Sequence, residues 1–432
     1  MSRKNQFQDR RIYNVKVYSE RGEWAKKRKS AARRALAAIV LSFTLVVFTV
    51  MIGLQFINHT LKDRETPFFL PAASAEPERV SVTEAVPMAA DGASVPEDKK
   101  TPADNGVAYE GDLELPVNGS TGYAPVELTM RALPEANSVA VKSVPSGRGF
   151  LVLGEEDDWW EIDFDGLTGW VRHADCMINL PDVIPSIRYD ATNTYSSEFV
   201  SSRVEIPNIS GLQLYPGRAF NERLGKDEFI VAVMYPMAKK IHAAQKNALE
   251  NGDSLIIYEG FRPYSVQALV AKELKSLANS DRHVYEGLNA SPWNIGWFIA
   301  PGVSTHQTGC AIDAGLIKAE LNYKITGKYR YLITISPDNY QFIYIMPSKI
   351  HELSAASILY AYPVQSGQTA PYSEGVEENG PCRNLQTYCS DAGLTPLASE
   401  WWHFDDLQTN RAAPGNSKGD YILEECRSVP PE

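Results

Sequence analysis

The sequence predicts three structural parts in succession: one transmembrane helix, a small all-β barrel, and a larger α+β domain with a mainly antiparallel sheet. Three observations lead to this fold class. A long uncharged apolar run lies near the N-terminus, short β-rich runs follow in residues 109–180, and helical and strand patterns then mix without regular alternation in residues 181–432. A chain of 432 residues is long enough for about two or three domains.

The N-terminal part carries a strong charge asymmetry. Residues 1–34 hold twelve Lys and Arg against three Asp and Glu, whereas the remainder holds 30 basic and 50 acidic residues. Residues 35–57, ALAAIVLSFTLVVFTVMIGLQFI, are uncharged and long enough to cross a bilayer as a helix, which takes about 20 residues. Basic residues favour the cytoplasmic side, so we expect a single-pass protein of the cell membrane with a cytoplasmic N-terminal tail. Nucleic-acid binding by this tail is not expected, because its position beside the membrane explains its charge.

A cleaved signal peptide ending near Ala73-Ser74-Ala75 is the alternative to this anchor. The apolar run is longer than that of a signal peptide, and the cleavage site would lie far beyond it, so the uncleaved anchor is favoured. Residues 58–108 follow as a Pro- and Ala-rich linker with little apolar material to bury.

Residues 109–180 have the pattern of a small all-β barrel. Four β-rich runs, PVELTMRA, GFLVLGEE, WWEIDFDG and TGWVRHA, are separated by turn-forming residues. Trp159-Trp160 followed by Gly169-Trp170-Val171 resembles a bacterial SH3-type domain. The resemblance implies exposed aromatic residues that bind cell-wall peptides, but tryptophans that form the core of the barrel explain the same pattern.

Residues 181–432 are expected to form the larger domain. Apolar residues recur every three or four positions in its helical segments, whereas its strand segments are short and rich in Ile, Leu, Tyr and Phe. The expected elements are two helices, 229–252 and 265–279, a buried strand, 253–261, and a strand pair, 329–336 and 339–347, around a turn at Pro337-Asp338-Asn339.

Five cysteines are present, and no CxxC pair occurs, so a thiolate zinc cluster is not indicated. A location outside the cytoplasm permits disulfides, and Cys382 with Cys389 would be one pair. Five free and mostly buried thiols are the alternative.

The stretch GVSTHQTGCAIDAG, residues 302–315, places His306 and Asp313 seven positions apart. A helix would hold them about 10 Å apart and a straight strand more than about 20 Å apart. A shared metal ion requires both within about 2.0–2.2 Å of it, so the chain would have to fold back, which Gly309 permits. The run Cys310-Ala311-Ile312 would then begin a strand that carries Asp313. The alternative is a glycine turn with one surface His and one surface Asp.

A second stretch, SEWWHFDD at 399–406, adds Glu400 and His403. Together with His306 and Asp313, His403 completes two imidazoles and one carboxylate, a set suited to Zn²⁺. Three protein ligands leave a position open for water, which is typical of a catalytic site, and Glu400 could take a proton from that water. The alternative is an aromatic core strand with an incidental Glu and His.

A third stretch, YEGFRPYSVQ at 258–267, places Arg262 directly after a predicted buried strand, and Gln267 at the start of the next helix. A guanidinium can bind a carboxylate through two hydrogen bonds or hold a developing oxyanion. The alternative is a surface Arg that caps a turn.

These motifs carry a family resemblance. The pattern SxHxxGxAxD, which begins at Ser304, together with EWWH at 400–403 and GFRPYSVQ, resembles the zinc D-alanyl-D-alanine peptidases, which include VanX-type dipeptidases and VanY-type D,D-carboxypeptidases. The resemblance covers residues 181–410. It implies an α+β zinc peptidase domain in which the residues have the following roles: His306, Asp313 and His403 bind zinc, Glu400 is the catalytic base, Arg262 stabilises the tetrahedral intermediate, and Ser304 helps to hold the substrate carboxylate, with Gln267 as a further substrate contact.

The sequence departs from the dipeptidases at one position. Those enzymes carry an Asp that binds the free amine of the dipeptide, whereas MPSKIHELS, residues 346–354, places His351 there. An imidazole gains little from a substrate ammonium, so His351 as the substrate contact favours longer peptides over the free dipeptide.

The expected function is therefore zinc-dependent hydrolysis of the D-Ala-D-Ala bond of peptidoglycan stem peptides, or of the free dipeptide, by an extracytoplasmic domain. The expected partners are peptidoglycan and, through residues 35–57, the membrane. One alternative is an L,D-carboxypeptidase of the same mechanism, because the shape of the pocket decides the stereochemistry. Another is a non-catalytic cell-wall-binding protein, against which the complete ligand set argues.

Overall fold

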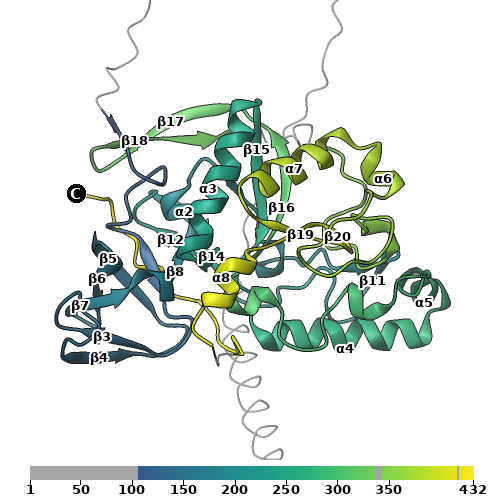
Figure 1. The fold of residues 1–432 in the computed structure, drawn as a ribbon, viewed down its shortest axis with the longest axis horizontal. Coiled ribbons are helices and arrows are strands. Elements are labelled where there is room, and N and C mark those ends of the chain that lie inside the picture. The colour runs from purple at the N-terminus through teal and green to yellow at the C-terminus, as the bar shows by residue number, and fades with distance from the viewer. Residues whose placement is uncertain (1–105, 336–342, 416–417) are drawn as a thin grey trace, which may run out of the picture. The chain divides into compact units, whose positions relative to one another are not determined.

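The structure, a computed structural model, describes residues 106–335, 343–415 and 418–432 (Figure 1). These residues belong to one compact unit, Asp98–Glu432. Two sheets organise it, one of eight strands and one of five, and smaller sheets and helices accompany them.

The eight-stranded sheet is antiparallel throughout and has the strand order β14-β8-β2-β5-β6-β7-β3-β4. Trp160 of this sheet is fully buried, Trp159 is 9 % exposed, and Trp170 is half-buried, so these rings belong mainly to the core and not to an exposed aromatic surface. The strands are β2 (Thr121–Tyr123), β3 (Leu128–Arg131), β4 (Ala140–Val144), β5 (Gly149–Glu156), β6 (Trp159–Phe164), β7 (Leu167–Arg172), β8 (Met177–Asn179) and β14 (Ala232–Met234).

The five-stranded sheet has the order β19-β20-β16-β15-β9 and is antiparallel except for the pair β15 and β9. All residues of β15 and β20 are buried, as are all but the last of β16, so the centre of this sheet is covered on both faces. The strands are β9 (Arg188–Tyr189), β15 (Asp253–Glu259), β16 (Ala311–Lys318), β19 (Thr395–Leu397) and β20 (Glu400–Asp405).

Two helices, α3 (Tyr235–Glu250) and α7 (Gly380–Asp391), pack against each other and against the five-stranded sheet (Figure 1). The buried residues of α3 recur every three or four positions, from Met237 through Ile241 to Ala248, which is the apolar stripe that helix packing requires. The other helices are α2 (Leu180–Val183), α4 (Tyr264–Ser280), α5 (Arg282–Leu288), α6 (Glu374–Glu377) and α8 (Leu407–Ala412).

The smaller sheets hold the remaining strands. They are β1 (Val107–Ala108) with β17 (Leu321–Thr326) and β18 (Tyr329–Thr334), then β10 (Val200–Ser201) with β11 (Val204–Glu205), and β12 (Arg218–Asn221) with β13 (Lys226–Phe229).

The predicted helix 265–279 and the predicted strand 253–261 are confirmed by α4 and β15. The predicted helix 229–252 is confirmed from Tyr235 onward, but its first residues form β14 instead. The predicted strand pair is wrong in its partner. Within the described residues β18 pairs with β17, and Ile343 makes only an isolated bridge to Ile317, while the predicted turn lies outside the described residues.

As a statement of fold class, the predicted series of a transmembrane helix, a separate small barrel and an α+β domain is wrong. The described residues form a mixed α/β structure with antiparallel sheets, and β14 joins the eight-stranded sheet from beyond residue 181, pairing Ala232 with Asn179 of β8. None of the helices in the described residues has the length and apolar character needed to cross a membrane. The predicted segment 35–57, the basic tail and the linker to residue 105 lie outside these residues.

All five cysteines are free thiols, and four of them are buried. Cys382 and Cys389 both lie on α7 and are therefore not a disulfide pair in this structure.

The C-terminal segment, residues 418–432, runs from the five-stranded to the eight-stranded sheet. The ring of Tyr421 stacks on Phe261, just after β15, with centroids 4.7 Å apart. Farther along, the Oγ of Ser428 lies 2.6 Å from Oγ1 of Thr121 in β2, and the N–H of Val429 donates to the backbone oxygen of Gly119 at 2.8 Å. The segment therefore ties the two sheets together.

Candidate metal centre

Three buried side chains from two distant stretches converge in the five-stranded sheet. The Nε2 of His306 lies 3.1 Å from Nδ1 of His403 and 3.3 Å from Oδ1 of Asp313. The same carboxylate oxygen lies 3.1 Å from Nδ1 of His403. The structure thus brings together the three residues that the sequence predicts as ligands, in a group that could hold a metal ion.

A tight turn brings His306 back toward the strand that follows it. Ser304 caps a short 3₁₀ helix, Thr305–Thr308, with its Oγ 3.4 Å from the N–H of His306. Gly309 then adopts a left-handed conformation with a φ of 68°, which glycine reaches without steric cost. A Cβ there would lie 2.7 Å from the sulfur of Met177, so glycine is needed for packing as well. The predicted fold-back at Gly309 is confirmed.

Strand register supplies the remaining alignment. Asp313 of β16 lies directly opposite His403 of β20, and on its other side opposite Glu259 of β15. Residues directly opposite on neighbouring strands point to the same face, with Cβ atoms about 4.5–5.5 Å apart. Asp313 is therefore the middle member of a row of three ionisable side chains, between Glu259 and His403.

The outward-facing ring nitrogens of both histidines are held by oxygen acceptors. The Nδ1 of His306 donates to the backbone oxygen of Gly260 at 2.7 Å, and the Nε2 of His403 donates to Oδ1 of Asp405 at 2.9 Å. Thr305 donates to the same Asp405 oxygen at 2.6 Å. Such partners fix the tautomer and the ring orientation of metal-binding histidines.

These tautomers leave three acceptors facing one another. With both outward nitrogens protonated, the neutral rings of His306 and His403 present lone pairs to each other and to Oδ1 of Asp313. Three buried acceptors about 3 Å apart require a shared cation, either a proton or a metal ion. Ligands at about 2.0–2.1 Å from a tetrahedral zinc ion lie about 3.3–3.4 Å from one another, so the donor set fits that ion.

A proton is the alternative to a metal ion as the shared cation. Burial lowers the pKa of His403, but Asp405 and Asp313 outweigh it, and the pKa is held well above its usual value. Burial likewise raises the pKa of Asp313, yet the surrounding histidines keep it well below its usual value. A metal ion that binds here therefore displaces a proton from the pair.

The second oxygen of Asp313 faces a different group. Its Oδ2 lies 3.1 Å from Nε2 of His351 and 3.9 Å from Nη1 of Arg262, and that Nη1 also forms an ion pair with Glu259. Glu259, Asp313 and His351 form a second cluster of metal-ligating residue types, but a second ion there would compete with the guanidinium of Arg262 for the same carboxylates. One metal ion per chain is therefore the stoichiometry that this arrangement favours.

Glu400, at the start of β20, lies close to this centre and is 9 % exposed. Burial raises its pKa to about 8, against the lowering effect of His403. A carboxyl group that exchanges its proton near neutral pH is suited to general base and general acid catalysis.

A cleft of ≈ 300 Å³ opens onto the centre. Glu400, His403 and Asp405 are among its lining residues, and Trp297 to Ala300 contribute apolar groups to the lining. Its other lining residues include Arg262, Gln267, Ser304, Thr305 and Leu397.

The predicted substrate contacts are placed differently from one another. Arg262, Gln267 and Ser304 line the cleft. Within the described residues, the Nε of Arg262 and the Oε1 of Gln267 are buried without hydrogen-bond partners, so each keeps one polar atom free. His351 is 0 % exposed, contacts Oδ2 of Asp313, and is not among the residues that line the cleft. Its contact with a substrate stays a prediction.

Sequence reasoning missed Asp405 and Glu259. Asp405 could have been found, because it follows His403 by two positions on a strand and therefore shares its face. Glu259 could have been noticed only as a charged residue at the end of an apolar strand. Its partners, Asn193 at 2.8 Å and Tyr215 at 2.9 Å, come from segments with no such signal.

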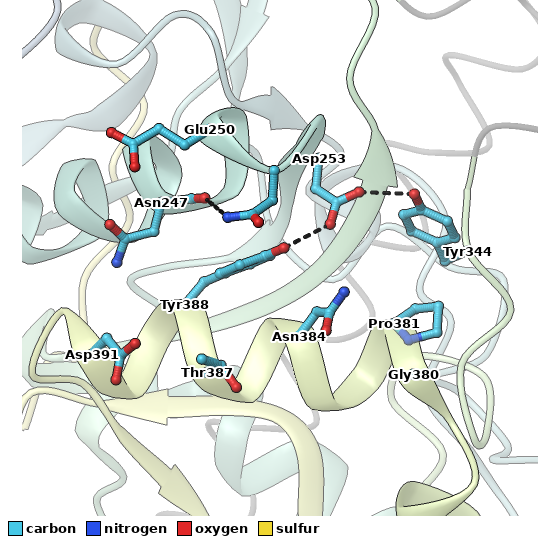
Figure 2. A pocket seen from close by; sticks show the side chains of 11 residues that line it. Asn247, Glu250, Asp253, Tyr344, Gly380, Pro381, Asn384, Thr387, Tyr388 and Asp391 are labelled. Atoms are coloured by element: carbon cyan, nitrogen blue, oxygen red, sulfur yellow. Dashed lines mark hydrogen bonds between the residues drawn. The ribbon is translucent and has the colours of Figure 1, made fainter.

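A larger cleft of ≈ 720 Å³ lies between the end of α3 and α7 (Figure 2). In Figure 2, Tyr344 and Tyr388 point toward Asp253, and their hydroxyls donate to its two carboxylate oxygens at 2.8 and 2.9 Å. None of the three converging ligands lines this cleft, and the carboxylate of Asp253 already has two donors. The chemistry of the centre therefore belongs to the smaller cleft.

No protein-family model matches the chain, and no curated protein matches it either.

Proposed function

We propose that the protein is a zinc-dependent peptidase that cleaves the D-Ala-D-Ala bond of cell-wall peptides on the outer side of the cytoplasmic membrane. The observation that supports this most is the convergence of three buried acceptors, from His306, Asp313 and His403, beside the carboxyl group of Glu400 at a cleft. The motif resemblance supplies the substrate class.

When bound, zinc would polarise the scissile carbonyl and make a water molecule more acidic. Glu400 would take the proton from that water and later give it to the leaving amine, which suits a group whose pKa lies near neutrality. Arg262 lines the cleft with its Nη1 held by Glu259, and the positive charge of its guanidinium would stabilise the developing oxyanion.

The rest of the cleft would orient the peptide. Gln267 lines the cleft in a fixed orientation, because its Nε2 donates to the backbone oxygen of Ala300 at 3.0 Å, and it would form part of the surface against which the peptide lies. Ser304 can donate its hydroxyl proton to the terminal carboxylate, because its oxygen serves the 3₁₀ helix only as an acceptor. The apolar groups of Trp297 to Ala300 would exclude water from the reacting bond.

The proposal is tested with the purified full-length protein and three substrates: free D-Ala-D-Ala, a stem pentapeptide ending in D-Ala-D-Ala, and a tetrapeptide ending in a single D-Ala after an L-configured centre. Released D-Ala is measured. We expect the highest kcat/KM on the pentapeptide. The nitrogen of its penultimate D-Ala is part of an amide bond, whereas in the free dipeptide it is an ammonium group. The enzyme therefore needs no carboxylate to bind this nitrogen in the pentapeptide.

Release from the tetrapeptide alone would favour the L,D-carboxypeptidase alternative. No release from any substrate by zinc-loaded protein would contradict the proposal and favour a binding protein. A clear preference for the free dipeptide would contradict the expected preference for longer peptides.

The pH dependence of the reaction is expected to have an acidic limb. A general base acts only when ionised, and burial raises the pKa of Glu400, so kcat/KM should rise with pH as this carboxyl group loses its proton. A nearby metal cation favours the carboxylate, so the midpoint should lie below about 8. The measurement is a pH–rate profile at saturating zinc. A rate that stays constant or rises as the pH falls from 8 to 5 would exclude Glu400 as the base.

A further inference from the structure

The two oxygens of Asp313 have different surroundings. Oδ1 faces the two histidine nitrogens, whereas Oδ2 accepts from Nε2 of His351 at 3.1 Å and lies 3.9 Å from Nη1 of Arg262. A carboxylate whose second oxygen is held by a donor presents only one oxygen to a metal ion. The group that holds Oδ2 therefore controls how Asp313 can coordinate.

His351 is fixed for this contact. Its ring stacks on Phe199 with centroids 4.5 Å apart and meets Trp402 edge-on at 6.1 Å. Within the described residues its Nδ1 has no hydrogen-bond partner, so the bond to Asp313 is the one polar contact described for the buried ring. A lone partner on a fully buried imidazole indicates that the ring is placed there for Asp313.

The backbone of His351 is held in a costly conformation. Its φ is 58°, in the left-handed region that side chains other than glycine adopt at a steric cost. Backbone hydrogen bonds to Val200 hold this conformation. The N–H of Val200 donates to the oxygen of His351 at 3.2 Å, and the N–H of Leu353 donates to the oxygen of Val200 at 2.8 Å. The carboxylate of Glu352 accepts from two further N–H groups of residues 202–203.

Phe199 links His351 to the other donor. The guanidinium carbon of Arg262 lies 5.6 Å from the centroid of the same ring on which His351 stacks. The ring of Phe199 thus contacts both groups that face Oδ2 of Asp313, the guanidinium of Arg262 and the imidazole of His351.

We infer that His351 is a positioning residue of the metal centre: its N–H reserves Oδ2 of Asp313, so that the metal ion is bound through Oδ1 alone. This inference rests on the metal site of the proposed function. It differs from a role at the substrate amine, because the buried ring acts through Asp313. It also differs from a second metal site, in which Nε2 of His351 would carry no proton.

The inference is tested by metal affinity, with a matched pair of variants in the full-length protein. His351→Gln keeps an N–H donor, and His351→Met has a similar length without one; both are unbranched at Cβ, so the backbone cost is the same. Zinc affinity is measured by competition with a chromophoric chelator. We expect the Met variant to bind zinc about 10- to 100-fold more weakly than the wild type, the range found for loss of outer partners of a metal ligand, and the Gln variant to recover most of the loss.

A second measurement reports the coordination itself. The visible absorption of the cobalt-substituted protein depends on ligand number and geometry. It should change in the Met variant, in which both Asp313 oxygens are free to bind, and should resemble the wild type in the Gln variant. If the Met variant does not fold, His351→Asn replaces it, since Asn tolerates left-handed backbone and its shorter amide does not reach Oδ2.

Wild-type zinc affinity and an unchanged cobalt spectrum in the Met or Asn variant would overturn the inference while leaving the proposed function intact. Equal losses in the Gln and Met variants would also overturn it, because the ring and not its N–H would then matter. Two zinc ions per wild-type chain would assign His351 as a ligand instead. A wild-type protein that binds no metal would overturn the inference and the proposed function together.

Discussion

Glu400→Gln is expected to reduce kcat on the order of 10²- to 10⁴-fold, the usual contribution of a positioned general base, while zinc remains bound. Gln has nearly the same shape as Glu and fits the same buried position, but it cannot take a proton. Zinc should remain because Glu400 is not one of the three converging ligands. The measurements are steady-state kinetics on the pentapeptide and zinc content by elemental analysis.

The matched control is Asp253→Asn in the larger cleft. Asp253 is also a buried carboxylate, yet its partners are the hydroxyls of Tyr344 and Tyr388, and it lines no part of the smaller cleft. We expect its kcat to stay close to the wild-type value. Full activity in the Glu400 variant, or a comparable loss of kcat in the Asp253 variant, would move the chemistry away from the centre proposed here.

His306→Ala and Asp313→Ala are each expected to lose most of the bound zinc, and with it the activity. Each variant removes one of three acceptors that lie within 3.1–3.3 Å of one another, and the two that remain no longer complete a site for the ion. Zinc per chain is measured by elemental analysis after gel filtration; we expect about one in the wild type, since zinc sites with three protein ligands are mononuclear catalytic sites.

His283→Ala is the control for these variants, because His283 lies exposed on α5 away from the centre. It should retain full zinc. Ligand variants that fold and keep one zinc per chain would show that the converging residues do not form the metal site.

The part of the site that sequence could predict is the part determined locally. The turn at Gly309 joins His306 to Asp313 within eight residues, and a left-handed glycine is a local requirement that the spacing makes visible. The register that places Asp313 opposite His403 joins strands 90 residues apart, and no local pattern specifies it. The ligand chemistry of the side chains and the motif resemblance linked the two stretches, but neither specifies the register.

The contact between His351 and Asp313 is a second feature that the sequence did not predict. The neighbours of His351 in sequence suggested a place at the substrate, but its orientation depends on a left-handed backbone and on pairing with Val200. Val200 lies about 150 residues earlier in the chain, so this pairing has no local signal. The contact with Asp313 therefore could not be seen in the sequence.

The fold errors have the same origin. Residues 232–234 are apolar and lead into a helix, so they resemble its first turn, yet their backbone groups pair with β8. The hairpin of β17 and β18 turns at Gly327, but most residues of β17 are exposed, so its apolar pattern is weak. In both segments, pairing with a distant strand determines the secondary structure, although the local sequence pattern does not predict it.

The C-terminal segment has a consequence for the order of folding. Its hydrogen bonds to Thr121 join residues more than 300 positions apart in the sequence. Closing so long a loop costs conformational entropy before the contacts that it brings together can stabilise the chain. Contacts of this range form late. The same segment stacks Tyr421 on Phe261 and accepts from the N–H of Tyr264 at 3.0 Å, on either side of Arg262. During refolding, the loop that carries the arginine should therefore become rigid last, and turnover should recover more slowly than the sheets themselves form.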